Sequence, residues 1–159
     1  MTLIIPAVIW SSATATLHDC PHDRERALFL DGPHPAEGAP AVATTLVLPH
    51  ITHSRGHYEI TPGDMSRAGR HLRELGLIRL AQMHSHPGGG TGHSEHDDAM
   101  AFSRRDGAIS IVVPHYGACA PGLADCGIHS CQDGEWQEIG VTAVARYVQV
   151  VPSVLDFRA

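Results

Sequence analysis

Short apolar or β-branched runs alternate with amphipathic segments along the chain, and this pattern predicts a mixture of strands and helices. Strands are expected where such runs are bounded by glycine, proline or polar residues, at 26–32, 41–49, 56–60, 77–86 and 108–114. Residues 126–140 predict a hairpin around Asp133-Gly134, a dipeptide typical of tight turns. Helices are expected over 5–17, 62–75 and 94–105, while 145–151 fits either element.

Boundary signals define two of these helices. Thr61 and Asp64 fit a capping box, and Gly76 follows the last turn of the same helix. Pro6 opens the first helix, whose expected face consists of Ile5, Val8, Ile9, Ser12 and Thr16. Strands mixed with helices predict an α/β (α+β) fold with a central sheet flanked by helices, in a single domain over residues 1–159.

Composition narrows the function classes. The hydrophobic fraction of 43% suits a globular chain, and a formal net charge of −6 argues against nonspecific binding to nucleic acid. The early apolar run LIIPAVIW is too short to cross a bilayer and lacks the basic start of a signal peptide. We therefore expect a cytoplasmic protein that binds neither nucleic acid nor a membrane.

The cysteines leave a second metal site open. No two of Cys20, Cys119, Cys126 and Cys131 have C-x-x-C spacing, and a disulfide framework is not expected in a chain of this length without a secretion signal. The last three lie close enough to His129 in sequence to suggest a second zinc site. Their irregular spacing favours buried or inert thiols instead.

The densest group of chemically active residues lies in the stretch MHSHPGGGTGHSEHDDAM, from Met83 to Met100. His84 and His86 are two residues apart at the end of an expected buried strand, so their side chains point to the same face. Asp97 falls in the first turn of the next helix, which faces back toward the strand end. Two imidazoles and one carboxylate leave a fourth position open, as in a catalytic zinc site.

Each of these residues also has a purely structural interpretation. Ser94 with Asp97 is a plain capping box, and the two strand histidines could be satisfied core histidines. We assign His93 and His96 as solvated loop histidines. The joint pattern of H-x-H-P, six residues and then S-x-x-D is far more specific than any of its parts.

This pattern resembles the JAMM (MPN+, JAB) metalloprotease motif at every fixed position: His84, His86, Pro87, Ser94 and Asp97. The match is most similar to the stand-alone prokaryotic JAB peptidases. The resemblance implies a JAB/MPN-like fold, related to that of cytidine deaminases, with a mixed central sheet. It also implies that the two histidines and Asp97 bind Zn²⁺, and that Ser94 helps to stabilise the developing oxyanion.

The resemblance further implies an upstream glutamate near the start of an early strand that ends in glycine. Glu25 opens the stretch ERALFLDG, which Gly32 closes, so we choose Glu25 as the general base. A solvated surface charge is the alternative for this residue. The other candidates are Glu59 in an expected insertion of the family pattern, Glu74 on an amphipathic helix, and Glu95 directly after the motif serine.

The activity that the family resemblance implies is hydrolysis of the bond after the C-terminal glycine of a ubiquitin-like protein. Some relatives occur beside E1-like and E2-like proteins in bacterial antiphage operons, which makes such proteins candidate partners. Residues 50–61 are our candidate edge for pairing with an extended substrate tail, although they also fit a solvent loop.

Two alternatives remain at this point. A deaminase would need H-x-E and P-C-x-x-C, and a zincin H-E-x-x-H; the chain has no C-x-x-C and no H-E-x-x-H sequence, which argues against both. A JAB-type hydrolase could instead act on a small amide or an amino-acid adduct of a sulfur carrier. The non-enzymatic alternative is an MPN scaffold that binds partners without metal.

Overall fold

A six-stranded sheet forms the centre of the computed structural model, which describes residues 1–19, 24–54 and 57–156. The strand order is β10-β9-β8-β7-β2-β4. In chain order these strands are β2 (Ala27–Pro33), β4 (Thr45–Val47), β7 (Leu77–Ser85), β8 (Ile109–Val113), β9 (Gly127–Gln132) and β10 (Glu135–Glu138). Only β7 and β8 pair in parallel, and the other neighbours are antiparallel. The expected mixed central sheet is therefore confirmed.

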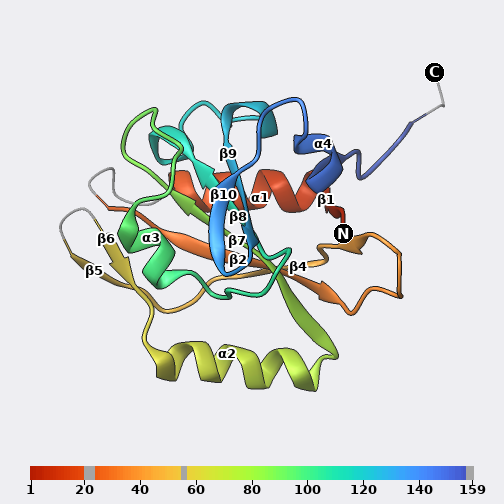
Figure 1. The fold of residues 1–159 in the computed structure, drawn as a ribbon, viewed down its shortest axis with the longest axis horizontal. Helices are drawn as coiled ribbons and strands as arrows, with labels where there is room; N and C mark the ends of the chain where they lie inside the picture. The colour runs from red at the N-terminus through yellow and green to blue at the C-terminus, as the bar shows by residue number, and fades with distance from the viewer. Residues whose placement is uncertain (20–23, 55–56, 157–159) are drawn as a thin grey trace.

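Helix α1 (Ala7–His18) packs on one face of this sheet (Figure 1). It buries Trp10, Ala13 and Leu17 against the strands. The strand side chains of this core come from alternate positions, as the two-residue period of a strand requires, and include Leu28, Leu30, Ala81, Met83, Ile109 and Ile111.

The first helix differs from our expectation. Residues Leu3–Pro6 form β1, which pairs in parallel with β11 (Val148–Val151), and α1 starts only after Pro6. The expected apolar face is wrong as well, because Val8 is 59% exposed while Ala13 and Leu17 are fully buried. Ile5 pairs with Val150 of β11 and so belongs to a strand instead of the helix, which the local pattern does not show. The helix therefore packs through a different face from the one expected.

The expected strand at 41–49 is in fact two short strands in different sheets. β3 (Ala41–Val42) pairs with β1, and β4 pairs with β2. Together β11, β1 and β3 form a second, three-stranded sheet. The chain therefore crosses from one sheet to the other between Val42 and Thr45.

Helix α2 (Pro62–Glu74) forms as predicted, and its cap explains its start. The backbone N–H of Asp64 donates to the side chain of Thr61 at 3.2 Å. Helix α3 (Glu95–Met100), in contrast, is shorter than the predicted 94–105. The chain turns extended at Ala101 (ψ 136°), and the Phe102 N–H then donates to the side chain of Gln82 at 3.1 Å.

The C-terminal third follows local signals closely. The β9–β10 hairpin turns at Asp133 (φ 52°) and Gly134 (φ 80°), which confirms the predicted turn. The ambiguous stretch 145–151 contains both elements, a short helix α4 (Val144–Tyr147) followed by β11. Two 3-10 turns, η1 (Pro114–Gly117) and η2 (Leu123–Asp125), connect β8 to β9.

A separate two-stranded hairpin lies beside α3 in Figure 1. It consists of β5 (Thr52–Ser54) and β6 (His57–Glu59), and pairs with neither larger sheet. Tyr58 inserts from it into the protein and is 1% exposed. In the part of the chain that the structure describes, no helix is long and apolar enough to cross a membrane.

Candidate metal centre

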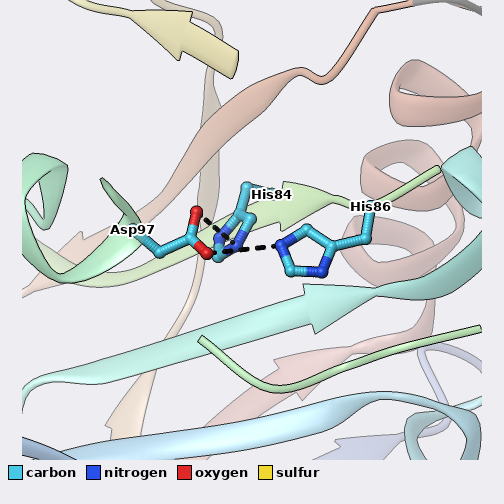
Figure 2. A group of neighbouring side chains, drawn as sticks. All are labelled: His84, His86 and Asp97. Carbon is cyan, nitrogen blue, oxygen red and sulfur yellow. Dashed lines mark ion pairs between the residues drawn. The ribbon is translucent and has the colours of Figure 1, made fainter. Parts of the chain in front are cut away.

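The end of β7 and the first turn of α3 bring three of the predicted residues together. His84 Nε2 lies 3.2 Å from Asp97 Oδ1, and His86 Nε2 lies 3.4 Å from Asp97 Oδ2. Figure 2 shows the two imidazoles converging on the carboxylate. One potential ligand atom from each residue lies within 4.8 Å of the other two, so the group could hold one metal ion.

The turn after β8 holds the loop that follows His86. The His86 N–H donates to the Val113 carbonyl at 2.9 Å, and the His86 carbonyl accepts from the Tyr116 N–H at 2.9 Å. The Gly88 carbonyl accepts from the His115 N–H at 3.0 Å. His115 and Tyr116 have left-handed φ values of 52° and 53°, a conformation that costs about 1–3 kcal/mol per residue. Backbone strain is therefore concentrated next to the site.

The buried imidazole of His84 lacks a protein partner. Both its ring nitrogens are buried without a hydrogen bond, although Nε2 is close to Asp97. A buried unsatisfied polar atom costs about 1–3 kcal/mol, and a metal ion at Nε2 would satisfy one of the two. His86 Nδ1 lies 3.0 Å from the Gly90 carbonyl, so Nδ1–H donates there and Nε2 presents its lone pair to the site. This donor set fits Zn²⁺.

The pKa shifts of His84 and Asp97 suit metal binding, whereas that of His86 means that a metal ion must displace a proton there. Burial lowers the pKa of His84, which favours the neutral imidazole. Burial alone would raise the pKa of Asp97, but the imidazoles of His84 and His86 outweigh it and hold that pKa well below its ordinary value. Hydrogen bonding to Asp97 raises the pKa of His86. The carboxylate is therefore ionised, as a metal ligand must be.

Ser94 caps α3 and bonds the metal-site carboxylate. Its N–H and its Oγ–H both donate to Asp97 Oδ2 at 2.7 Å, and the Asp97 N–H donates back to Ser94 Oγ at 3.2 Å. The capping box is thus present. Because the hydroxyl proton is engaged with Asp97, the role of Ser94 toward an oxyanion stays a prediction.

Glu25 lies at the same end of the sheet, just before β2. The β2–β7 ladder extends beyond the last strand residue, since the Ser85 N–H donates to the Arg26 carbonyl at 3.0 Å and the Arg26 N–H donates to Ser85 Oγ at 3.1 Å. One step further along this antiparallel ladder, Glu25 stands across from His86.

The electrostatics of Glu25 link it to the triad. Burial raises its pKa, His86 opposes that shift, and Asp97 adds to it. Glu25 thus lies close enough to His86 and Asp97 to interact with both, while its role as general base stays a prediction. The other glutamates considered from the sequence are exposed: Glu59, Glu74 and Glu95.

Residues 10–122 match the family described as prokaryotic homologs of the JAB domain, Prok-JAB, which is more than half of the chain. The chain belongs to this family.

Similar proteins agree with this family and with the fold. Over 68 residues, 42% of the chain, the Prok-JAB protein is 41% identical to "Probable metalloprotease y4jG" of Sinorhizobium fredii, and the match covers 41% of that relative's length. Protein DSY2949 of Desulfitobacterium hafniense is similar in structure, with a TM-score of 0.71, 15% identity, and coverage of 96% of this chain and 95% of that one. AF2198, a JAB1/MPN domain protein from Archaeoglobus fulgidus, gives a TM-score of 0.53 at 16% identity, covering 93% and 98%. The two structures show that the expected JAB/MPN fold is correct.

One histidine that we expected in solvent is buried in this Prok-JAB chain. The His93 side chain is 6% exposed, its Nδ1 lies 2.8 Å from Asp98 Oδ1, and its Nε2 lies 3.0 Å from Ser110 Oγ. Its ring stacks on His129 with centroids 4.0 Å apart. Burial lowers the pKa of His129 to about 3, so the stacked partner is neutral near pH 7. The glycine-rich loop folds back onto the sheet, which a loop's composition does not reveal.

His96 is also misassigned as a solvated histidine. Its Nε2 lies 3.0 Å from the Tyr58 carbonyl oxygen, which joins α3 to the β5–β6 hairpin. No motif in the sequence indicated this contact, because it depends on a hairpin that lies 38 residues earlier.

The second metal site considered for the Prok-JAB cysteines does not form. Across residues 1–19, 24–54 and 57–156, the only group suited to a metal ion is the His84, His86 and Asp97 triad. Cys119 is exposed, Cys131 is buried, and burial raises the pKa of the Cys126 thiol to about 12. Cys20 lies outside the described residues.

Proposed function

We propose that this Prok-JAB chain is a zinc metallopeptidase that hydrolyses the bond after the C-terminal glycine of a ubiquitin-like protein. One observation carries the proposal: His84, His86 and Asp97 converge where β7 ends, and Glu25 interacts with His86 and Asp97. The named activity of the relative y4jG supports a peptidase rather than a metal-free scaffold.

The three residues of the triad would hold the zinc ion and leave a fourth position for water. A zinc ion held there would acidify a water molecule and polarise the substrate carbonyl. The protein's own contribution is to present an ionised carboxylate, the neutral imidazole of His84, and the imidazole of His86, which releases its Nε2 proton when it binds the ion. The contact between His86 Nδ1 and the Gly90 carbonyl keeps the His86 ring oriented.

Glu25 is suited to move the proton during hydrolysis. Its carboxylate would take a proton from the attacking water and pass it to the leaving amine. Burial raises the pKa of Glu25, and a higher pKa makes the group a stronger base and a more readily protonated donor. Ser94 would assist by turning its Oγ–H from Asp97 toward the developing oxyanion.

The substrate part of the proposal rests on the β5–β6 hairpin. An extended C-terminal tail could pair with a strand edge of this hairpin, and backbone hydrogen bonds would then supply affinity. The His96 contact with the Tyr58 carbonyl joins the hairpin to α3, which carries Asp97. A tail bound there would lie near the metal centre. Its source would be a ubiquitin-like protein encoded with E1-like and E2-like enzymes, as in an antiphage operon.

The test uses a ubiquitin-like protein from the same genome, fused after its terminal glycine to a fluorescent reporter. The zinc-loaded protein should release the reporter, and a chelator or Glu25→Gln should stop the release. Glu95→Gln is the matched control, because Glu95 is exposed and directly follows the motif serine. Turnover of a small amide without cleavage of any fusion would favour the sulfur-carrier alternative. A folded protein that binds no zinc would favour the scaffold.

A further inference from the structure

The metal-site aspartate lies on a helix too short to hold itself in place. α3 has six residues, and isolated helices of this length are not stable in water. The position of Asp97 therefore depends on contacts between α3 and the rest of the protein. Besides the Ser94 cap, two histidines make such contacts, one on each side of the serine.

His93 connects the first turn of α3 to the central sheet. One ring nitrogen bonds the Asp98 carboxylate at 2.8 Å, and the other bonds the Ser110 hydroxyl of β8 at 3.0 Å. Asp98 is the residue directly after the metal-site aspartate. The stacking partner His129, on β9, supports the same ring from another strand. We call His93, Asp98 and Ser110 the His93 brace.

The brace bears on the metal site through geometry. β8 pairs in parallel with β7, and Val112 of β8 is the register partner of His84. Ser110 therefore lies on a strand adjacent to the one that carries both imidazoles. The hydrogen bonds from His93 to Ser110 and Asp98 therefore hold α3, which carries Asp97, at a fixed distance from the strands beside His84.

We propose that His93 is a positioning residue for the metal: through Asp98 and Ser110 it holds Asp97 within reach of His84 and His86. The inference deepens the proposed function, because it requires that the triad bind zinc. It does not require any particular substrate.

His96 provides the contrast on the opposite side of α3. Its partner is the Tyr58 carbonyl of β6, so it joins α3 to the hairpin. Loss of His96 should loosen the hairpin and weaken zinc binding less than loss of His93 does. His71, exposed on α2, is a second control for the loss of an imidazole.

The experiment measures the zinc dissociation constant by competition with a chromophoric chelator. His93→Ala should weaken zinc binding by roughly 10- to 100-fold, the range seen when residues that orient metal ligands are removed. His93→Asn should recover part of the affinity, because its amide can still donate to Asp98. His71→Ala should bind zinc almost as the wild type does, and His96→Ala should be affected less than His93→Ala.

Two further measurements separate positioning from a general loss of structure. The absorption spectrum of the Co²⁺-substituted protein should change in His93→Ala and not in His71→Ala, since only the former displaces a ligand. Thermal unfolding of the metal-free variants should show that both remain folded. If His93→Ala binds zinc as tightly as the wild type, with the same Co²⁺ spectrum, the inference is wrong.

Zinc binding and cleavage, measured together, distinguish failure of the His93 brace from failure of the proposed function. A wild type that binds zinc, loses it in His93→Ala and cleaves no ubiquitin-like fusion would contradict the proposed substrate and support the brace. A wild type that binds no zinc would overturn both.

Discussion

The two faces of the central sheet are built from the same strands and have opposite characters. Met83 points into the apolar core with Leu28 and Ile111, under α1. The next residue along β7, His84, is just as buried but lies among polar groups and outside the apolar core. One face holds the fold together, and the other holds groups with a high cost of burial. The candidate metal centre lies on the second face.

The polar side chains on the second face can be buried because most of them are hydrogen-bonded to one another or to the backbone. Gln82 donates to the Tyr58 hydroxyl at 3.0 Å and accepts from the Phe102 N–H, and Ser110 bonds His93. The exceptions are both ring nitrogens of His84, and Nδ1 of His129 and Nε1 of Trp136 nearby, which are buried without a hydrogen bond. We therefore expect substitution of His84 to affect mainly zinc binding, and substitution of its neighbour Met83 to affect mainly stability.

The largest effect should come from the double variant His84→Ala/His86→Ala. It removes two of the three ligands, so zinc and peptidase activity should both be lost. The metal-free double variant should be less stable than the metal-free wild type, because it loses the contacts of both imidazoles with Asp97 and the contact of His86 with the Gly90 carbonyl, and truncation of the buried His84 leaves a cavity. Metal analysis and thermal unfolding check the two halves of this prediction, and stoichiometric zinc in the double variant would disprove the ligand assignment.

Glu25→Gln should keep the zinc and reduce turnover by ~10²–10⁴-fold, as loss of a general base does. Metal content and kcat are the measurements. Near-normal turnover in Glu25→Gln, together with an inactive Glu59→Gln, would show that the wrong carboxylate was chosen.

The same residue predicts a pH dependence. Burial raises the pKa of Glu25, and the base must be ionised to accept a proton, so activity should rise with pH at values above the ordinary range of a glutamate. This acidic limb of the profile should disappear in the residual activity of Glu25→Gln. A limb that persists unchanged would assign it to another group.

On the opposite face, Met83→Ala should lower the free energy of unfolding by about 2–5 kcal/mol through loss of burial and creation of a cavity. Its zinc affinity should be unchanged. Chemical denaturation and chelator competition together test this contrast with His84. A Met83→Ala protein that loses zinc and keeps its stability would contradict the division of roles between the two faces.

The smallest effect is expected for Ser94→Ala measured without metal. Loss of the α3 cap should cost about 0.5–2 kcal/mol. A decrease in kcat much larger than this destabilisation explains would indicate that the hydroxyl also acts on the substrate. Thr61→Ala, which removes the cap of α2, is the matched control.

The features that could be predicted from the sequence are those encoded by neighbouring residues. The Thr61 cap, the Asp133-Gly134 turn and the strand leading to His84 each depend on a few adjacent side chains, and the structure contains them. The convergence of His84 and His86 follows from strand periodicity alone.

The features that were missed depend on partners distant in sequence. Leu3–Pro6 is a strand only because β11 and β3 lie on either side of it. α3 stops early because Gln82 captures the Phe102 N–H, and His93 is buried because Ser110 and Asp98 hold it. No local pattern encodes such contacts, so composition suggested a longer helix and a solvated loop.

The parallel pairing of β7 with β8 has a consequence for how such a protein can change. Parallel neighbours cannot be joined by a tight turn, so a long crossover between them is obligatory in this topology. The glycine-rich loop, Ser94 and Asp97 all lie within that crossover. Insertions or deletions there alter the reach of the loop while the pairing of the flanking strands stays the same. Variation can thus accumulate beside the metal centre and leave the architecture intact.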